Sequence, residues 1–253
     1  MKRIAAFAAL AVSTLVQGQN LVTNGGFESV TGGTSGHIGV NGIGLDGWTA
    51  TRLSGSVNSL PHSFALVGTA AQFSEGGTGV YSAYGAPGGG TQLNLWGAIP
   101  DASRGNILAV EADQSWVATQ LSTTVSGLTP NASYTLTFDW AAAQQYGFSG
   151  DTSSGWQGSV GATPFDTTAL AIGNHGFSGW QTQTISFTAG PTGSEVLSFI
   201  AYGTGGGLPP MALLDNVQVN PVVVPEPGEY AGAFAGLLVV AGIARKIRAN
   251  QAK

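Results

Sequence analysis

Cysteine is absent from the 253 residues of the chain. Its absence excludes disulfides, thiol catalysis, iron–sulfur clusters and cysteine-ligated zinc. A domain of this size does not need disulfides, because its hydrophobic core is large enough to hold it together. The chemistry of the protein therefore has to come from oxygen, nitrogen and aromatic side chains.

Basic residues are scarce, and they lie almost entirely at the two ends of the chain. Between residues 19 and 220 the only basic residues are Arg52 and Arg104, whereas 11 acidic residues occur there. This stretch has a formal net charge of −9, compared with −5 for the whole chain. Such a surface repels a phosphate backbone, so the composition argues against nucleic-acid binding. It is compatible with divalent cations and with neutral polymers such as polysaccharide.

The long apolar periodicity of amphipathic helices is also missing between residues 19 and 220. Glycine, serine, threonine, valine and aromatic residues dominate there, which is typical of short strands joined by tight turns. In residues 133–140, Tyr134, Leu136, Phe138 and Trp140 fall on one face of a half-buried antiparallel strand. We predict an all-β fold, a β-sandwich of jelly-roll type, over residues 19–220. Further strands are predicted at 107–112, 117–125, 181–188, 195–201 and 213–219, with two or three more among long loops in 31–105.

The first 18 residues have the features of a removable export signal. Lys2 and Arg3 form a positive start, and residues 4–16 are an apolar run without a charge. We predict cleavage by signal peptidase after Gly18, so that the mature chain begins at Gln19. The alternative is an N-terminal membrane anchor, for which the apolar run is short.

Residues 221–253 have the features of a membrane tail. Pro225, Glu226 and Pro227 favour extended backbone, and residues 230–244 carry no charge. As a helix this run spans about 22 Å at ~1.5 Å per residue, less than the roughly 30 Å of a bilayer core. Its retention is therefore predicted to depend on the basic residues that follow, which stay cytoplasmic. These residues are Arg245, Lys246 and Arg248. The alternative, a buried C-terminal helix, would surround its far end with unpaired cations.

The order of these parts resembles the PEP-CTERM sorting signal, a Pro-Glu-Pro motif followed by a short membrane segment and a basic end. The resemblance covers about the last thirty residues. It implies recognition by an exosortase-type enzyme in the inner membrane and cleavage of the tail. It also implies delivery to the cell surface or extracellular matrix of a Gram-negative-type bacterium.

Three patches in residues 19–220 resemble the galactose-binding-like jelly rolls that include many carbohydrate-binding modules. Residues 20–28, followed by Gly47-Trp48, resemble the opening strand, residues 120–138 the central hairpin, and residues 213–217 the closing strand. The resemblance implies a jelly roll and carbohydrate as the ligand class. A purely structural matrix protein without a specific ligand is the alternative, and a glycoside hydrolase is a more distant one.

The same resemblance implies a candidate structural calcium. In such jelly rolls an opening glutamate and a closing aspartate help to hold the ion, and Glu28 and Asp215 occupy the matching positions. Calcium takes six to eight oxygens, so backbone carbonyls and water would have to complete the site. The alternative is that Glu28 caps a turn and Asp215 bonds locally to backbone.

All six tryptophans lie between residues 19 and 220. Trp140 is predicted to point inward by the alternation of its strand, and Trp48 matches a core position of the resembled family. Trp96 and Trp156 are flanked by turn residues, so they are our candidates for flat rings that stack on a sugar. The alternative is that each ring packs over a loop. Trp116 and Trp180 fit either role.

Enzyme signatures are mostly absent, and we predict that the protein is not an enzyme and assign no catalytic residue. Residues 42–47 spell GxGxxG, but no strand and helix surround them, so we interpret them as a loop. Glu111 and Asp113 would share one strand face about 7 Å apart. A glycosidase could use two carboxylates at such a separation. The alternative is a pair of ordinary surface carboxylates without a catalytic role, which is far commoner than a catalytic pair.

Overall fold

The computed structural model describes residues 19–40, 42–53, 65–82, 92–100, 104–116 and 118–222. Every described residue except Val222 belongs to one compact unit, Gln19–Pro221. In these ranges no helix combines the length and the apolar character that crossing a membrane requires. The predicted signal and most of the predicted tail lie outside the described residues, including Pro225, Glu226, Pro227, Arg245, Lys246 and Arg248.

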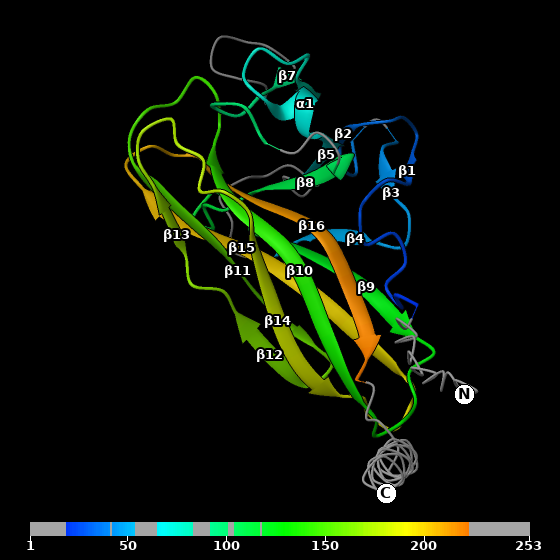
Figure 1. Cartoon of the computed structure of the whole chain (residues 1–253). Helices are drawn as coiled ribbons and strands as arrows, with labels where there is room; N and C mark the ends of the chain where they lie inside the picture. Colours follow the sequence, from blue (N-terminus) through cyan, green and yellow to red (C-terminus); the bar gives the residue numbers. More distant parts are fainter. Residues whose placement is uncertain are drawn as a thin grey trace, which may run out of the picture. The chain divides into compact units, whose positions relative to one another are not determined.

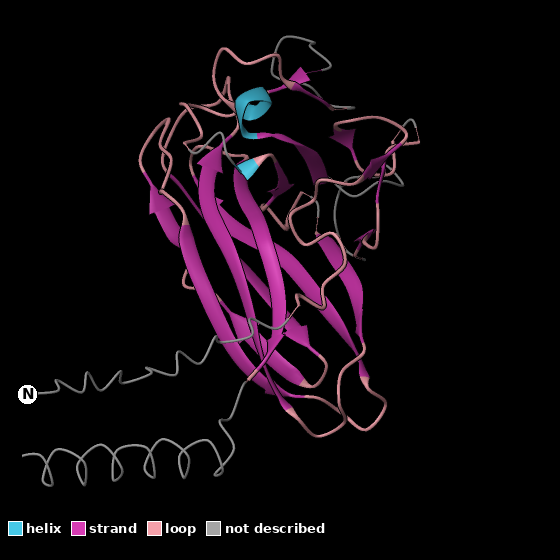
Figure 2. Cartoon of the chain, turned by 45° about the vertical axis from the view of Figure 1, so that its right-hand side comes forward, coloured by secondary structure: helices cyan, strands magenta, loops and turns pink. Residues whose placement is uncertain are grey.

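Two antiparallel sheets pack face to face in this unit (Figures 1 and 2). Sheet I has the strand order β14-β10-β16-β8-β5-β2. These strands are β14 (Gln181–Thr188), β10 (Ser133–Gln144), β16 (Pro210–Pro221), β8 (Asn106–Glu111), β5 (Ala65–Thr69) and β2 (Gly36–His37). Sheet II has the order β12-β11-β15-β9-β4, and β13 also pairs with β11. These strands are β12 (Thr163–Asp166), β11 (Thr152–Val160), β15 (Ser194–Gly205), β9 (Thr119–Ser126), β4 (Thr49–Arg52) and β13 (Leu170–Ile172).

The chain alternates between the two sheets from β8 to β11 and again from β14 to β16. The predicted all-β sandwich is therefore confirmed, and the alternation is what a jelly roll requires. All six strands predicted in residues 107–219 are present. β14 has the predicted bounds, β10, β15 and β16 are longer than predicted, and the ends of β8 and β9 differ from the prediction by one or two residues. Two short pairs complete the strand set: β1 (Val30–Thr31) with β3 (Gly44–Leu45), and β6 (Val80–Tyr81) with β7 (Gln92–Leu93).

The main core lies between the sheets. Sheet I contributes the predicted inward face of β10, and sheet II contributes Leu121, Trp156 and Phe199 among others. The rings of Phe138 and Phe199 meet edge to face across the interface, with centroids 5.0 Å apart. Such pairs add to the stabilisation that burial alone supplies. The predicted inward position of Trp140 is confirmed by its place in this core.

A second hydrophobic core lies on the outer side of sheet I, beneath a cap. We use "cap" for α1 (Ala70–Phe73), β6, β7 and the turns beside them, which Figure 1 shows around one end of the sheet. Phe73 and Leu93 from the cap pack with Ala109 and Ala141 from the sheet. A capping box, in which Thr69 and Gln72 bond each other's backbone N–H groups, begins the short helix. The described parts of residues 31–105, where the sequence predicts two or three strands, thus hold six short strands, β2 to β7, and the helix α1, and part of this region covers one sheet face.

Candidate functional site

The outer face of sheet II carries the candidate site, and the alternation of its strands sets the chemistry of that face. On β9, Leu121 and Val125 point into the core, so Gln120, Ser122 and Thr124 point outward. On β15, Leu197 and Phe199 point inward, which turns Ser198, Ile200 and Tyr202 outward. The result is a surface of hydroxyls and amides with few charges.

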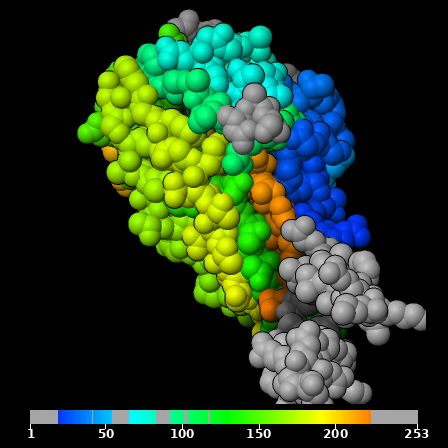
Figure 3. All heavy atoms as spheres, viewed as in Figure 1, coloured from blue at the N-terminus to red at the C-terminus, as the bar shows by residue number. Residues whose placement is uncertain are grey.

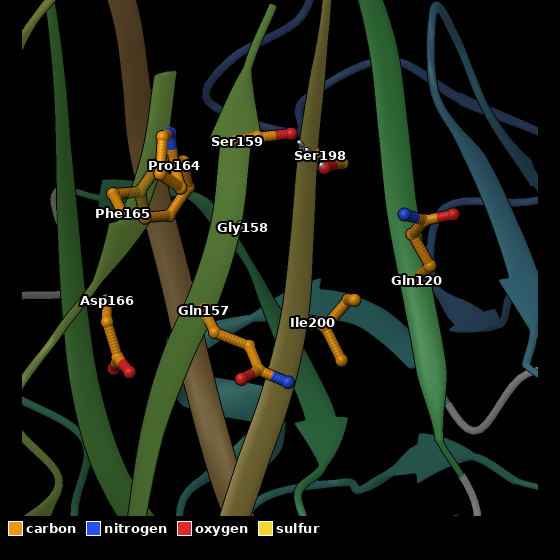
Figure 4. Close-up of a pocket in the computed structure, with 9 residues that line it drawn as sticks. All are labelled: Gln120, Gln157, Gly158, Ser159, Pro164, Phe165, Asp166, Ser198 and Ile200. Atoms are coloured by element: carbon orange, nitrogen blue, oxygen red, sulfur yellow. Dashed lines mark hydrogen bonds between the residues drawn. The ribbon is translucent and has the colours of Figure 1, made fainter. Parts of the chain in front are cut away.

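A groove of about 620 Å³ crosses β12, β11, β15 and β9 on this face (Figure 4). The amides of Gln157 and Gln120 stand on either side of Ile200. The Ser159 and Ser198 hydroxyls lie 3.2 Å apart and hydrogen-bond across the β11–β15 pair. The remaining lining residues are Gly158, Pro164, Phe165 and Asp166. The groove therefore has an apolar floor between groups that both donate and accept hydrogen bonds.

Asp166, which lines the groove, is hydrogen-bonded to Tyr202, which lies outside the groove lining. The Tyr202 hydroxyl is 2.9 Å from Oδ1 of Asp166 and also contacts the carbonyl of Thr167. Burial, followed by the hydrogen bond with Asp166, raises the pKa of Tyr202 to about 12, so its hydroxyl stays neutral. The ring lies against Gly155, where a Cβ would come 2.9 Å from Cζ of Tyr202. Glycine at this position therefore lets the ring lie close to the sheet.

Two further hollows lie on the same sheet. One, of about 480 Å³, is lined by residues 113–115, 202–205 and Leu208. Tyr202 therefore lines this hollow and is also hydrogen-bonded to Asp166, which lines the groove. The other, of about 420 Å³, lies over β4 and β9 and is lined by threonines, Ser122, Gly47 and Val196. Across all three hollows the only charged lining residues are Asp113 and Asp166. The face is extended and close to neutral, although the chain is acidic.

Trp116 is the most exposed tryptophan in the part of the chain that the structure describes. It is 47% exposed and directly follows Ser115, which lines the hollow beside Tyr202. Its turn is held by its own backbone N–H, which donates to the carbonyl of Asp113 at 3.0 Å. The Asp113 side chain also accepts from the Ser115 backbone N–H at 3.0 Å. The sequence left Trp116 open between core and surface, and the structure places it on the surface.

Trp156 does not present a ring to solvent, so the prediction of an exposed platform there is wrong. The side chain is 0% exposed, and its indole N–H donates to the carbonyl of Leu213 at 3.0 Å. β11 is an interior strand of sheet II, and Trp156 falls on the side that faces sheet I. The flanking residues that suggested a turn are ordinary members of this strand.

Trp96 is half-buried in an aromatic cluster, and none of the residues of this cluster lines the three hollows. Its ring stacks on His175 with centroids 3.7 Å apart, and Tyr146 lies 4.3 Å away at a tilt. The indole N–H donates to the carbonyl of Phe148 at 2.7 Å. The neighbouring rings therefore cover part of Trp96, whereas Tyr146 and His175 are exposed.

Trp48 confirms the core position predicted for it. Its indole N–H is shared between the carbonyls of Thr23 and Asn24, at 3.1 and 3.2 Å. Its ring packs against Phe27 and Phe199. Trp180, which the sequence left open, lies beneath a guanidinium: Cζ of Arg104 is 4.3 Å from its ring centroid.

The candidate calcium ligands Glu28 and Asp215 bind two different residues of the segment 104–106. Oε1 of Glu28 accepts from the Asn106 backbone N–H at 2.8 Å. Nη1 of Arg104 lies 3.2 Å from Asp215 and 2.9 Å from Asp139. A guanidinium thus occupies the position beside Asp215 where calcium would need oxygen ligands. In the described ranges no group of three or more acidic or histidine side chains is arranged to hold a metal. This arrangement fits calcium poorly, and calcium binding stays a prediction.

The ion pair around Arg104 is partly buried, and its electrostatics reflect that. Burial raises the pKa of Asp215 to about 6, against the opposing effects of the Asn216 backbone N–H and Arg104. Burial also acts to lower the pKa of Arg104, but hydrogen bonds and charges from Asp139 and Asp215 outweigh it and raise the pKa. Arg104 therefore stays charged and compensates two neighbouring carboxylates on β10 and β16.

Glu111 and Asp113 do not form a pair of carboxylates around an open cleft. Glu111 is 2% exposed, and its Oε1 accepts from the backbone N–H of Asp113 at 3.1 Å. A glycosidase needs both groups against the scissile bond, and Glu111 does not reach solvent. The GxGxxG stretch contains β3 and a turn, and no helix follows it, so it lacks the helix N-terminus of a nucleotide site.

Sequence reasoning missed most residues of the groove. Gln157, Ser159 and Asp166 belong to β11 and β12, neither of which was predicted. A signal was present in the alternation of Trp156 and Val160 with polar residues, but glycine and serine obscured it. Gln120 and Ile200 fall in predicted strands, and their outward direction follows from period-two alternation.

No family model matches the chain, and no curated protein matches it in sequence. Among solved structures, the enzymatically active domain of bacteriophage CBA120 tailspike protein 4 aligns with 80% of the chain at 12% identity and a TM-score of 0.37. The chain spans only 21% of that protein. TmCBM61, solved in complex with beta-1,4-galactotriose, aligns with 81% of this chain and 99% of its own, at 14% identity and a TM-score of 0.38. The K3 adhesin domain of Lys-gingipain from Porphyromonas gingivalis w83 aligns over 69% and 92%, at 14% identity and 0.36. These values are too low to carry a functional argument.

Proposed function

We propose that the protein binds an extended, neutral polysaccharide along the outer face of sheet II. The observation that carries the proposal is the groove in which Gln120 and Gln157 flank Ile200, continued on the same sheet by two more hollows whose linings contain no basic residue. A long face with several hollows suits a polymer better than a single small molecule.

The chemistry of the groove matches that of a sugar. A pyranose has an apolar face of C–H groups and a rim of hydroxyls that donate and accept hydrogen bonds. Ile200 and Pro164 offer apolar contact, and the glutamine amides supply both donors and acceptors. Basic residues are absent from the linings of all three hollows, so a polyanion finds no counter-charge there.

Affinity measurements with the purified full chain test the proposal. Binding to a panel of neutral and acidic polysaccharides is measured by affinity electrophoresis, and binding to soluble oligosaccharides by calorimetry. We expect a neutral glucan, mannan, xylan or galactan to bind, and Gln120→Ala/Gln157→Ala to weaken binding at least tenfold, a loss of about 1.4 kcal/mol. Thr135→Ala/Thr137→Ala, on the outer face of sheet I, is the matched control and should bind like wild type.

Two results would contradict this proposal. If no glycan on the panel binds, the alternative of a structural matrix protein without a specific ligand is favoured. If a glycan binds but the glutamine variant retains full affinity, the site lies elsewhere, and the cluster of Trp96, Tyr146 and His175 becomes the first surface to test. Hydrolysis of a bound glycan would overturn the prediction that the protein is not an enzyme.

We also propose the export route that the sequence predicts: cleavage by signal peptidase, transient anchoring in the inner membrane and release by an exosortase-type enzyme. Its support is the order of parts in residues 221–253. The intact mass of the surface protein should lack Met1–Gly18 and the segment after about Pro227. A mature protein that retains Lys253 would contradict the sorting proposal.

Calcium binding by Glu28 and Asp215 is tested by the melting temperature in calcium compared with EDTA. An ion that binds only the folded state raises stability by about 2.7 kcal/mol at ~100 times its Kd. Equal melting temperatures, or an equal calcium shift in Asp215→Ala, would exclude the site.

A further inference from the structure

β14 forms one edge of sheet I, and it differs from the other sheet edges. It is eight residues long, and its sequence, QTQTISFT, contains no charged residue and no proline. The other edge of sheet I is β2, with two residues. In sheet II the edge strands are β4, which ends at Arg52, β12, which contains Pro164 and Asp166, and β13, which has only three residues. Short length, charge and proline are the usual features that prevent an edge from pairing. β14 lacks all of them.

The β14 ladder is also regular. Its pairing with β10 runs without a shift from Ser133 opposite Thr188 to Trp140 opposite Gln181, whereas the β10–β16 pairing contains a bulge. A bulge would twist the edge away from an incoming strand. Figure 3 shows this part of the chain, in yellow, running down the visible surface. A regularly paired, largely exposed edge strand of this length can pair with a further strand.

The direction of the unpaired backbone groups follows from Ala189, directly after the strand. Its N–H donates to Ala132 and its carbonyl accepts from Asn131, both at 2.9 Å, so both groups point toward β10. Successive residues of a strand point their backbone groups to opposite sides. The residue directly before Ala189, and every second residue before that one in β14, therefore point theirs outward. These residues are Thr182, Thr184, Ser186 and Thr188. In the described part of the chain, none of their backbone groups has a partner at this edge.

We infer that β14 pairs antiparallel with β14 of a second copy of this chain, joining two copies of sheet I about a two-fold axis at Ile185. In that register Thr184 lies opposite the partner's Ser186, and Thr182 opposite the partner's Thr188. Outward backbone groups then meet outward backbone groups, and outer faces stay on the same side. Threonine and serine are favourable in such cross-strand pairs.

Charge is compatible with this pairing although the stretch 19–220 carries a net charge of −9. β14 itself is neutral, and the neighbouring carboxylate of Asp139 is compensated by Arg104 and accepts from the Thr182 hydroxyl at 2.6 Å. The pairing does not depend on the proposed ligand. A dimer would nevertheless carry two copies of the sheet II face, and two sites on one polymer bind more tightly than one.

Sedimentation velocity of the purified full chain, without sugar, tests the pairing over concentrations up to roughly 0.5 mM, which covers weak dimers. We expect a concentration-dependent dimer. Thr184→Lys/Ser186→Lys places like charges directly opposite each other and should raise the dissociation constant at least ~tenfold. Thr135→Lys/Thr137→Lys adds the same charge to the same face one strand further in, and should dimerise like wild type.

A charge-swapped variant tests the register. In Thr184→Lys/Ser186→Glu each introduced amine faces an introduced carboxylate of the partner, so the dimer should recover. If it stays as weak as the double-lysine variant, the two-fold axis is not at Ile185 and that register is overturned. A wild-type chain that remains monomeric throughout, or a dimer that the double-lysine substitution leaves unchanged, overturns the pairing itself. Neither result bears on sugar binding, which is measured separately.

Discussion

The two sheets are both antiparallel, but their outer faces differ in chemical character. Part of the outer face of sheet I lies beneath the cap and is apolar, with Ala109, Ala141 and Leu213 in a second core. The outer face of sheet II is hollowed and carries glutamine, serine and threonine. Both faces follow from the same alternation of strand residues, so the choice of outward residue decides which face is covered. Alanine and leucine point outward where a cover exists, and amides and hydroxyls where solvent or a ligand does.

The largest expected effect breaks the covered face. Phe73 is fully buried and joins the cap to sheet I. Phe73→Ala should lower the free energy of unfolding by about 3–5 kcal/mol, as measured by urea denaturation, because it leaves a cavity. Ile200→Ala on the open face should cost less than about 1 kcal/mol, since Ile200 is only partly buried. Equal losses would show that the open face is also packed against another segment.

A smaller effect is expected from the carboxyls that the fold buries. Burial raises the pKa of Glu111 well above its usual value and raises that of Asp215 to about 6. The folded state therefore binds these protons more tightly than the unfolded chain does. Their contribution to the free energy of unfolding is largest at acid pH and falls as the pH rises through the folded pKa values. Each unit of pKa shift corresponds to about 1.4 kcal/mol.

Glu111→Gln isolates one of these groups. The amide oxygen still accepts from the Asp113 backbone N–H, but the side chain no longer ionises. We expect the variant to be more stable than wild type at pH 7 to 8, and its stability to vary less with pH. Urea denaturation across pH 4 to 8 measures this. A variant that is less stable at every pH would show that the carboxylate is stabilised by a partner.

The sequence predicted the strands of both sheets wherever apolar and polar residues alternate without interruption. β10 is the strongest case, because Tyr134, Leu136 and Phe138 alternate with threonines. β11 escaped because it reads TSSGWQGSV, and glycine and serine have low strand preference. Tertiary contacts override that preference: Gly158 leaves space for the Phe165 ring, where a Cβ would come 2.6 Å from Cζ.

The candidate site was less predictable than the fold, for a related reason. Trp156 was taken for a surface ring because Gly155 and Gln157 flank it, yet its strand is interior and its ring fills the core. Arg104 carried no local signal for its role, since its two carboxylates lie on strands distant in sequence. Local composition indicates turns, whereas burial depends on which strands become neighbours.

The smallest expected effect on stability is also the one most specific to the open face. Trp116 lies mostly in solvent, so Trp116→Ala should change the free energy of unfolding by no more than about 0.5 kcal/mol. If the polymer extends past Tyr202 toward residues 113–115, the indole ring stacks on a sugar, and its loss should weaken binding by about 0.5–1.5 kcal/mol, or roughly two- to twelvefold. Trp116→Phe keeps an aromatic face and should retain most of the affinity. Titration with oligosaccharides of increasing length measures both, because only chains long enough to leave the groove should sense the substitution. If the substitution also weakens binding of the shortest ligands, Trp116 contacts the sugar within the groove itself. If affinity is unchanged at every length, the bound polymer does not extend as far as Tyr202.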